Sequence, residues 1–149
     1  MKAGVDYIGI CTPFICHDGQ GYFLLQKRSN KTRDEQGVWE GGSGKVELGL
    51  TLEQNVLKEV EEEFGVVGEI QGQLPPETLI RENNGTQTHW VMVPYFIQVD
   101  REKVRINEPD KIDEIGWFPL DQFPTPLHSG LISVLDRYPE EFGRFSKKV

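Results

Sequence analysis

Residues 51–64 constrain the fold most, because their pattern is that of an amphipathic helix. Apolar residues recur every four positions and, at about 100° per residue, form one stripe made of Leu52, Val56, Val60 and Phe64. Thr51 precedes this stripe with Gln54 three residues later, which is the capping-box pattern. Gly65 supplies the residue that commonly ends a helix. The sequence therefore predicts a helix with one face buried against a core.

The margin of this stripe carries a group of glutamates. Glu59 and Glu63 lie four residues apart, and Glu62 is beside them. A solvated acidic face is the ordinary interpretation, but like charges at this spacing repel, and the helix dipole disfavours anions near the carboxyl end. No Lys or Arg follows any of them by four residues. A divalent cation would remove these penalties, and Mg²⁺ prefers a few carboxylates together with water and phosphate oxygens.

Residues 44–66 resemble the Nudix box, the signature of the Nudix (MutT-like) hydrolase family. That pattern is Gly, five residues, Glu, seven residues, then Arg-Glu-apolar-x-Glu-Glu-x-Gly-apolar. The residues that match at the correct spacing are Gly44, Glu59, Val60, Glu62, Glu63, Gly65 and Val66. A long spaced pattern is far more specific than a lone glycine motif. The resemblance implies the α/β class and a single Nudix domain over residues 1–149: an α/β/α sandwich with a mixed sheet and a loop-helix-loop catalytic motif.

The resemblance also implies a hydrolase that cuts the diphosphate linkage of a nucleoside diphosphate joined to another group. In the family the box glutamates hold Mg²⁺, with Mn²⁺ as an alternative ion, and a metal-activated water attacks phosphorus. Carried over, Glu59, Glu62 and Glu63 are the metal ligands and catalytic carboxylates, with Glu59 favoured as the base. The backbone at Ser43 offers a further candidate ligand. Glu108 is a candidate fourth carboxylate, with a simple turn as the alternative.

Two positions depart from the box. Leu50 stands where the family has a Glu that resembles an outer carboxylate near the metal. Lys58 stands where an Arg orients the following Glu; it keeps the charge but lacks the planar fork. We keep Lys58 as a candidate catalytic residue. The departures motivate an alternative class, a nucleotide-binding module with the Nudix fold and weakened catalysis.

Candidate substrate contacts outside the box are Arg28, Trp39 and His128. Arg28 ends the strand before the box and resembles a basic residue that touches phosphate in relatives, although a solvated arginine is an equal alternative. Trp39 and Trp90 could stack on a base, but core packing is the stronger expectation for each. His128 lies in a segment that lines the base pocket in nucleotide-directed relatives, although such a histidine is more often a surface or packing residue. Nucleoside triphosphates, oxidised ones included, nucleotide sugars and dinucleotides stay open, with a slight lean to triphosphates.

The composition bounds the partners. The formal charge of −8 disfavours a nonspecific nucleic-acid binder, which needs a basic face. No stretch approaches the roughly 18 apolar residues of a membrane span, and the start lacks the pattern of a secretory signal. Cys11 and Cys16 lie too far apart in one predicted strand for a disulfide. We therefore expect a cytoplasmic protein with a small-molecule nucleotide as partner, no nucleic acid and no membrane, and a homodimer stays open.

The remaining elements are predicted from apolar runs and turn residues. Strands are expected at residues 7–16, 22–28, 69–74, 78–81, 89–99 and 115–118, with a charged loop at 108–114. A second helix is expected at 126–138, where leucines recur every four residues. Strands mixed with two helices predict a mixed sheet that is covered on both faces.

Overall fold

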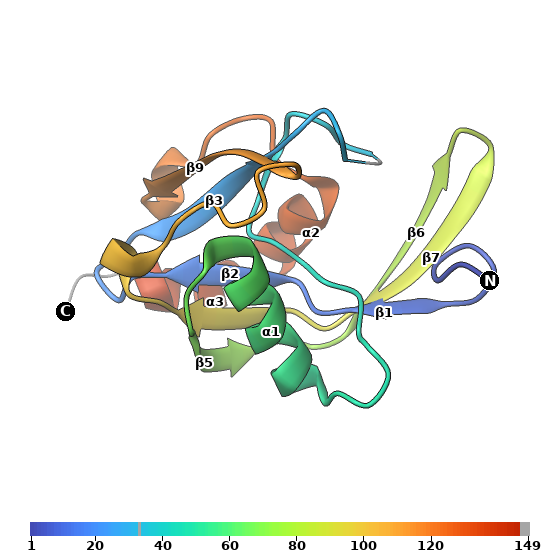
Figure 1. Cartoon of the computed structure of the whole chain (residues 1–149). Helices are drawn as coiled ribbons and strands as arrows, with labels where there is room; N and C mark the ends of the chain where they lie inside the picture. The colour runs from blue at the N-terminus through green and yellow to red at the C-terminus, as the bar shows by residue number, and fades with distance from the viewer. Residues whose placement is uncertain (33, 147–149) are drawn as a thin grey trace.

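Two sheets and three helices make up the chain in the computed structural model, which describes residues 1–32 and 34–146 (Figure 1). The strands are β1 (Gly9–Cys11), β2 (Phe14–His17), β3 (Phe23–Arg28), β4 (Trp39–Glu40), β5 (Glu69–Gln73), β6 (Glu77–Asn83), β7 (Thr86–Met92), β8 (Tyr95–Gln98) and β9 (Ile112–Phe118). The helices are α1 (Leu52–Phe64), α2 (Ser129–Arg137) and α3 (Pro139–Ser146), with short 3-10 turns η1 (Arg101–Lys103) and η2 (Leu120–Gln122). Lys147 and Lys148, for which the sequence predicts a solvated tail, lie outside the described residues.

The central sheet has the strand order β4-β3-β2-β8-β5, and β9 pairs with β3 as well. The β2 and β8 strands run parallel, whereas β3 is antiparallel to β2, β4 and β9. The predicted mixed sheet is therefore confirmed.

Side chains of the central strands alternate between the two faces of this sheet. The face under α1 buries Val56, Val60 and Phe64 against Phe14, Cys16, Leu24, Tyr95 and Ile97. The opposite face packs on α2 and α3 through Ile15, Phe23, Leu25, Phe96, Leu131, Val134 and Phe142. Helices on both faces of one sheet confirm the α/β/α sandwich.

The second sheet, in the order β1-β7-β6, projects from the body as an arm (Figure 1). Its presence corrects the prediction of single strands over 7–16 and 89–99, since each run breaks at a proline and passes from one sheet to the other. Pro13 and Pro94 carry no N–H to donate. Their neighbours keep the two runs paired, because Val93 N donates to Cys11 O at 3.0 Å and Tyr95 N donates to Pro13 O at 2.9 Å.

The main helix, α1, agrees closely with the prediction from the sequence, whereas the carboxyl-terminal helices differ from it. Thr51 forms the predicted capping box with Gln54, and Gly65 ends α1 in the left-handed conformation. The predicted helix at 126–138 begins only at Ser129, because residues 126–128 lie extended beside β4: Trp39 N donates to Pro126 O at 2.9 Å. The α3 helix was not predicted, and β9 begins inside the predicted loop 108–114.

The two cysteines are free thiols, as predicted, with Cys11 partly buried and Cys16 buried. None of the helices in the described part of the chain combines the length and the apolar character needed to cross a bilayer.

Candidate active site

Glu63 is the most deeply buried carboxylate of the box. Its side chain belongs to α1, is 7% exposed, and accepts a hydrogen bond at Oε1 from Gln26 Nε2 at 2.6 Å. Its second oxygen, Oε2, is buried without a hydrogen-bond partner among the described residues. Burial raises the pKa of Glu63 well above its ordinary value against the opposing effect of Gln26, and the nearby Glu40 and Glu59 raise it further. A buried carboxyl group with one unpartnered oxygen is a position that a cation would complete.

Glu59 lies one helical turn earlier, half-buried against Gly44. A Cβ atom built on Gly44 would lie 2.1 Å from Cδ of Glu59, so a larger residue at position 44 would displace this carboxylate. Burial raises the pKa of Glu59 to about 7, with Glu62 adding to the shift and Lys58 opposing it. The two inward carboxylates therefore repel each other in the absence of a cation.

Glu62 is turned outward and pairs with Lys58, four residues before it. Lys58 Nζ also lies 2.8 Å from Glu47 Oε2, and hydrogen bonds to Glu47 and Glu62 raise the pKa of Lys58. Lys58 thus contacts these two carboxylates, whereas the resemblance gives residue 58 the role of orienting Glu59. Over residues 1–32 and 34–146, no three His, Cys, Asp or Glu side chains already stand around one point as ion ligands. An ion held by the box glutamates would have to draw Glu62 inward.

The glycine loop, residues 41–44, passes beside these carboxylates. Gly41 O accepts from Gln26 Nε2 at 3.1 Å, on the side where Glu63 lies. The carbonyls of Gly42 and Gly44 instead accept from the backbone amides of residues 14 and 12, each at 2.9 Å. Ser43 lies between these glycines, and its backbone carbonyl stays a candidate ion ligand.

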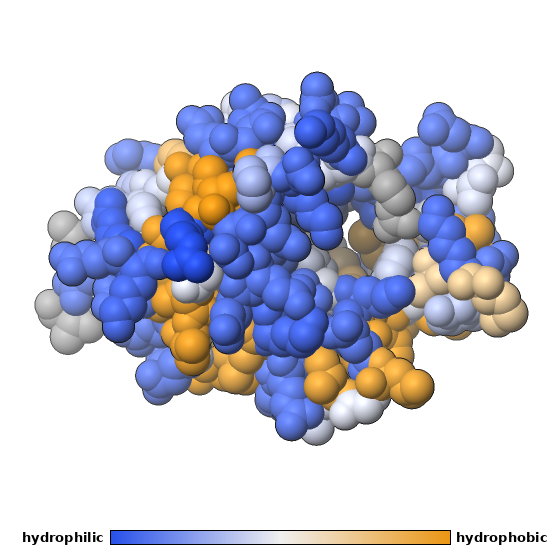
Figure 2. All heavy atoms as spheres, in the orientation of Figure 1, coloured by the Kyte–Doolittle hydropathy of each residue, from blue (hydrophilic) through white to orange (hydrophobic). Residues whose placement is uncertain are grey.

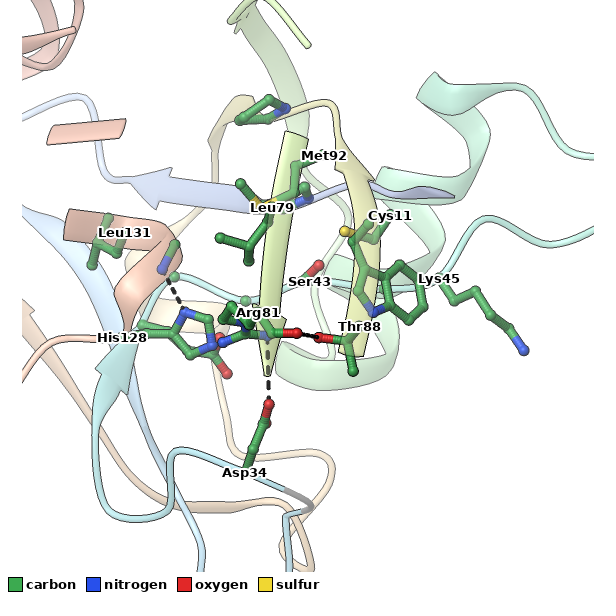
Figure 3. A pocket seen from close by; sticks show the side chains of 18 of the residues that line it. Cys11, Asp34, Ser43, Lys45, Leu79, Arg81, Thr88, Met92, His128 and Leu131 are labelled. Atoms are coloured by element: carbon green, nitrogen blue, oxygen red, sulfur yellow. Dashed lines mark hydrogen bonds and ion pairs between the residues drawn. The ribbon is translucent and has the colours of Figure 1, made fainter. Parts of the chain in front are cut away.

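A cavity of about 610 Å³ lies on the other side of the glycine loop. It occupies the hollow between the body and the β6–β7 arm that is visible in Figure 2. In Figure 3 its walls come from β1, β6, β7 and the start of α2. Its apolar lining includes Leu79, Trp90, Met92 and Leu131. The box glutamates are not among the lining residues, so the glycine loop is the wall that the cavity and the carboxylate site share.

Two of the predicted substrate contacts, Arg28 and His128, line this cavity but have partners within the chain. The Arg28 guanidinium lies 2.8 Å from Glu40 and 3.0 Å from Asp34. His128 Nδ1 accepts from Gly130 N at 3.0 Å. Since Nδ1 is an acceptor, a neutral His128 carries its proton on Nε2, which lies 2.8 Å from Glu35 Oε2. Both groups therefore help to fix the cavity wall.

Arg81, in β6, completes this polar end of the cavity. Its guanidinium pairs with Glu35, lies 3.5 Å from Asp34 and donates to Ser129 Oγ at 3.1 Å (Figure 3 draws the contact with Asp34). Burial opposes ionisation of Glu35, but hydrogen bonds from His128 and Ser129 lower its pKa overall. The segment after β3 is thereby tied to β6 and to the start of α2.

The other two predicted residues outside the box have different surroundings. Trp39 is 8% exposed and packs edge-on against Phe118, with ring centroids 5.4 Å apart, and it does not line the cavity. This is the core packing that the sequence favoured for it. The carbonyl of Glu108 accepts from the amides of Lys111 and Ile112 in a turn. Its carboxylate also raises the pKa values of Glu59 and Glu63, so the turn places it near the box glutamates.

Sequence reasoning missed Gln26 and Glu40. The two residues face each other across the β3–β4 pair. Gln26 holds Glu63, while Glu40 pairs with Arg28 and raises the pKa of Glu63. Glu40 stands directly before the glycine loop in the sequence, but only the strand pairing reveals its neighbours.

The NUDIX domain family model matches residues 10–138, and the chain belongs to this family. The MutT NUDIX hydrolase from Burkholderia pseudomallei is 31% identical, with a TM-score of 0.77 over 88% of this chain and 98% of that one. The NUDIX domain of Shewanella oneidensis NrtR, solved in complex with ADP ribose, shares the fold at 24% identity and a TM-score of 0.68. That match covers 95% of this chain and 90% of the NrtR chain.

Two curated relatives match part of the chain. The putative mutator protein MutT4 of Mycobacterium tuberculosis is 27% identical over 60% of this chain. The NAD-capped RNA hydrolase NudC of Stutzerimonas stutzeri is 29% identical over 71%. The aligned regions span only 36% and 35% of those two proteins. The family match places the chain in the Nudix family, whose members are generally pyrophosphohydrolases that use divalent metals.

Proposed function

We propose that this protein is a Mg²⁺-dependent hydrolase that cleaves the diphosphate linkage of a nucleoside diphosphate joined to another group, with Mn²⁺ as an alternative ion. One observation carries the proposal: the glycine loop has box carboxylates on one side and a nucleoside-sized cavity on the other. A substrate whose nucleoside enters the cavity would present its diphosphate at this loop.

The residues of the site would have separate roles in this reaction. A divalent cation bound there supplies Lewis-acid chemistry, neutralising the diphosphate and acidifying the attacking water. Glu59, Glu62 and Glu63 would hold it, together with the carbonyl of Ser43. Gln26 fixes the orientation of Glu63 through its hydrogen bond. Glu59, which lies against Gly44 of the glycine loop, is our choice of base.

The charges around the cavity support a direction for the substrate. Arg28 and Arg81 are balanced there by Asp34, Glu35 and Glu40. This end therefore offers no excess positive charge to a phosphate, and we place the base and ribose there. The NrtR domain in complex with ADP ribose supports nucleotide-like ligands as a class. Triphosphates, nucleotide sugars and dinucleotides remain the substrate classes to test.

A nucleotide-binding module with weakened catalysis is the second candidate. Leu50 and Lys58 favour it, as does the outward position of Glu62. The two candidates differ in turnover but share nucleotide binding.

A panel of nucleotides decides between them. The protein is incubated with nucleoside triphosphates, oxidised triphosphates, ADP ribose, nucleotide sugars and dinucleotides, with Mg²⁺, Mn²⁺ or EDTA, and products are separated by chromatography. We expect metal-dependent hydrolysis of a phosphoanhydride (P–O–P) bond in at least one of these substrate classes. Binding by calorimetry without cleavage of any substrate would favour the binding module. A protein that neither binds nor cleaves any member would refute both.

A further inference from the structure

At position 50 this chain has Leu where the family pattern has Glu, and another glutamate lies close by in the sequence. Glu47 lies three residues earlier, in the segment that joins the glycine loop to α1. Its Oε2 atom is 2.8 Å from Nζ of Lys58, which also contacts Glu62. A single ammonium group therefore links the loop before the helix to a box carboxylate on the helix.

The backbone at Glu47 is fixed from beneath by a buried amide. Glu47 N donates to Asn55 Oδ1 at 3.0 Å, and Asn55 Nδ2 donates to Thr12 Oγ1 at 3.0 Å. Asn55 is fully buried, and Leu50 N closes a turn by donating to Glu47 O at 3.2 Å. These bonds anchor the backbone from which the Glu47 side chain reaches Lys58.

The Leu50 side chain has no comparable role among the described residues. It is partly exposed and belongs to neither core cluster. Packing therefore does not require leucine at this position, and a carboxylate there would have room.

We infer that Glu47 supplies the carboxylate that the box lacks at position 50, and that it acts as a positioning residue through Lys58. This inference rests on the proposed function. With Glu47 present, Lys58 keeps an anionic partner when Glu62 turns inward to a cation. Without Glu47, the ion would have to take Glu62 from the ammonium group that holds it, so metal binding would weaken while the chemical step would not.

The test compares four forms of the full chain: wild type, Glu47→Gln, Glu47→Gln/Leu50→Glu and Glu61→Gln. Glu61→Gln is the matched control, because it removes the same charge from an exposed position beside Glu62. Mn²⁺ binding is measured directly by electron paramagnetic resonance without substrate. Hydrolysis of the best substrate is then measured as a function of Mn²⁺ concentration.

We expect Glu47→Gln to raise the dissociation constant for Mn²⁺ roughly tenfold, which is typical of residues that influence a metal through its ligands and do not contact it directly. At saturating Mn²⁺ its kcat should stay within about twofold of wild type, and Leu50→Glu should recover most of the lost affinity. Equal affinities for Glu47→Gln and Glu61→Gln would overturn the role of Glu47. A failure of Leu50→Glu to recover affinity would overturn the replacement of one carboxylate by the other. A wild-type protein that binds no Mn²⁺ would instead refute the proposed function, and this inference with it.

Discussion

The two sides of the glycine loop are built in different ways. On one side, a single helix supplies Glu59, Glu62 and Glu63 from five consecutive residues. On the other side, the cavity wall is assembled from distant parts of the chain: the amino-terminal segment with β1, the end of β3 and the loop after it, the β6–β7 arm and the start of α2. The proposed chemistry is thus local in sequence, and the proposed recognition surface is not.

The charges differ in the same way. The helix side gathers acidic groups, and Oε2 of the buried Glu63 has no hydrogen-bond partner in the described part of the chain. The polar end of the cavity pairs its two arginines within the chain, Arg28 with Asp34 and Glu40 and Arg81 with Asp34 and Glu35. A site whose acidic groups lack cationic partners favours a bound cation, whereas a site whose charges are paired selects its ligand by shape and hydrogen bonding. Variants on the two sides should therefore fail differently.

The largest effect is expected from Glu63→Gln on the helix side. The amide keeps the shape of the side chain but removes an anionic ligand, so metal-dependent turnover should fall by about 100-fold or more. The melting temperature in EDTA should change little, because burial already favours the uncharged form of Glu63. Turnover and melts are compared with Glu61→Gln, and wild-type turnover by Glu63→Gln would show that the ligand assignment is wrong.

A variant on the cavity side should affect substrate and leave the metal alone. Leu79 lines the cavity, and Leu79→Trp should fill part of it and raise KM about tenfold. The affinity for Mn²⁺ should match that of wild type. Ile80→Trp is the control, since Ile80 is the next residue on β6 and is 54% exposed. If Leu79→Trp and Ile80→Trp have the same KM, the cavity is not the binding site.

The raised pKa of Glu59, on the helix side, should make the stability of the metal-free protein depend on pH. Glu59 has a pKa of about 7 in the folded protein against 4.5 for its ordinary value. Between these values the unfolded chain has lost the proton that the folded protein retains, so this group lowers the free energy of unfolding as pH rises. Glu59→Gln should therefore be more stable than wild type above pH 7, by a few degrees in melting temperature, with the difference vanishing near pH 4.5.

Melts in EDTA across this pH range check that prediction. Adding Mn²⁺ should make wild type more stable than Glu59→Gln, because the ion stabilises the protein that binds it more tightly and Glu59→Gln lacks one ligand. A stability difference that does not change with pH would argue against a raised pKa at Glu59.

The smallest effect is expected from Lys58→Arg, which restores the residue of the family pattern. Arginine keeps the charge and can hold a carboxylate with two bonds, and the site is exposed enough to admit it. Activity at limiting Mg²⁺ should be unchanged or rise about twofold. A large fall in a well-folded Lys58→Arg variant would show that the lysine bridge between Glu47 and Glu62 has requirements of its own.

The sequence by itself determined the helix of the box and its place in the core. Leu52 to Phe64 follow a helical period, Thr51 and Gly65 mark the ends, and all these signals act between residues only a few positions apart. The same local spacing put Glu59 and Glu63 on one margin and, with the family pattern, identified the metal site to test. The free cysteines and the mixed sheet followed from the sequence as well.

Only the tertiary structure decided the cavity and the partners of the site. The pairing of β1 with β7 and the shared breaks at Pro13 and Pro94 create the arm, and no local pattern specifies which strands meet. Gln26 reaches Glu63 across 37 positions of sequence, and Arg81 reaches Glu35 across 46. Helical period is set by neighbours along the chain, whereas a cavity wall and a hydrogen bond to a buried carboxylate depend on strand register, which is fixed only when distant segments pack together.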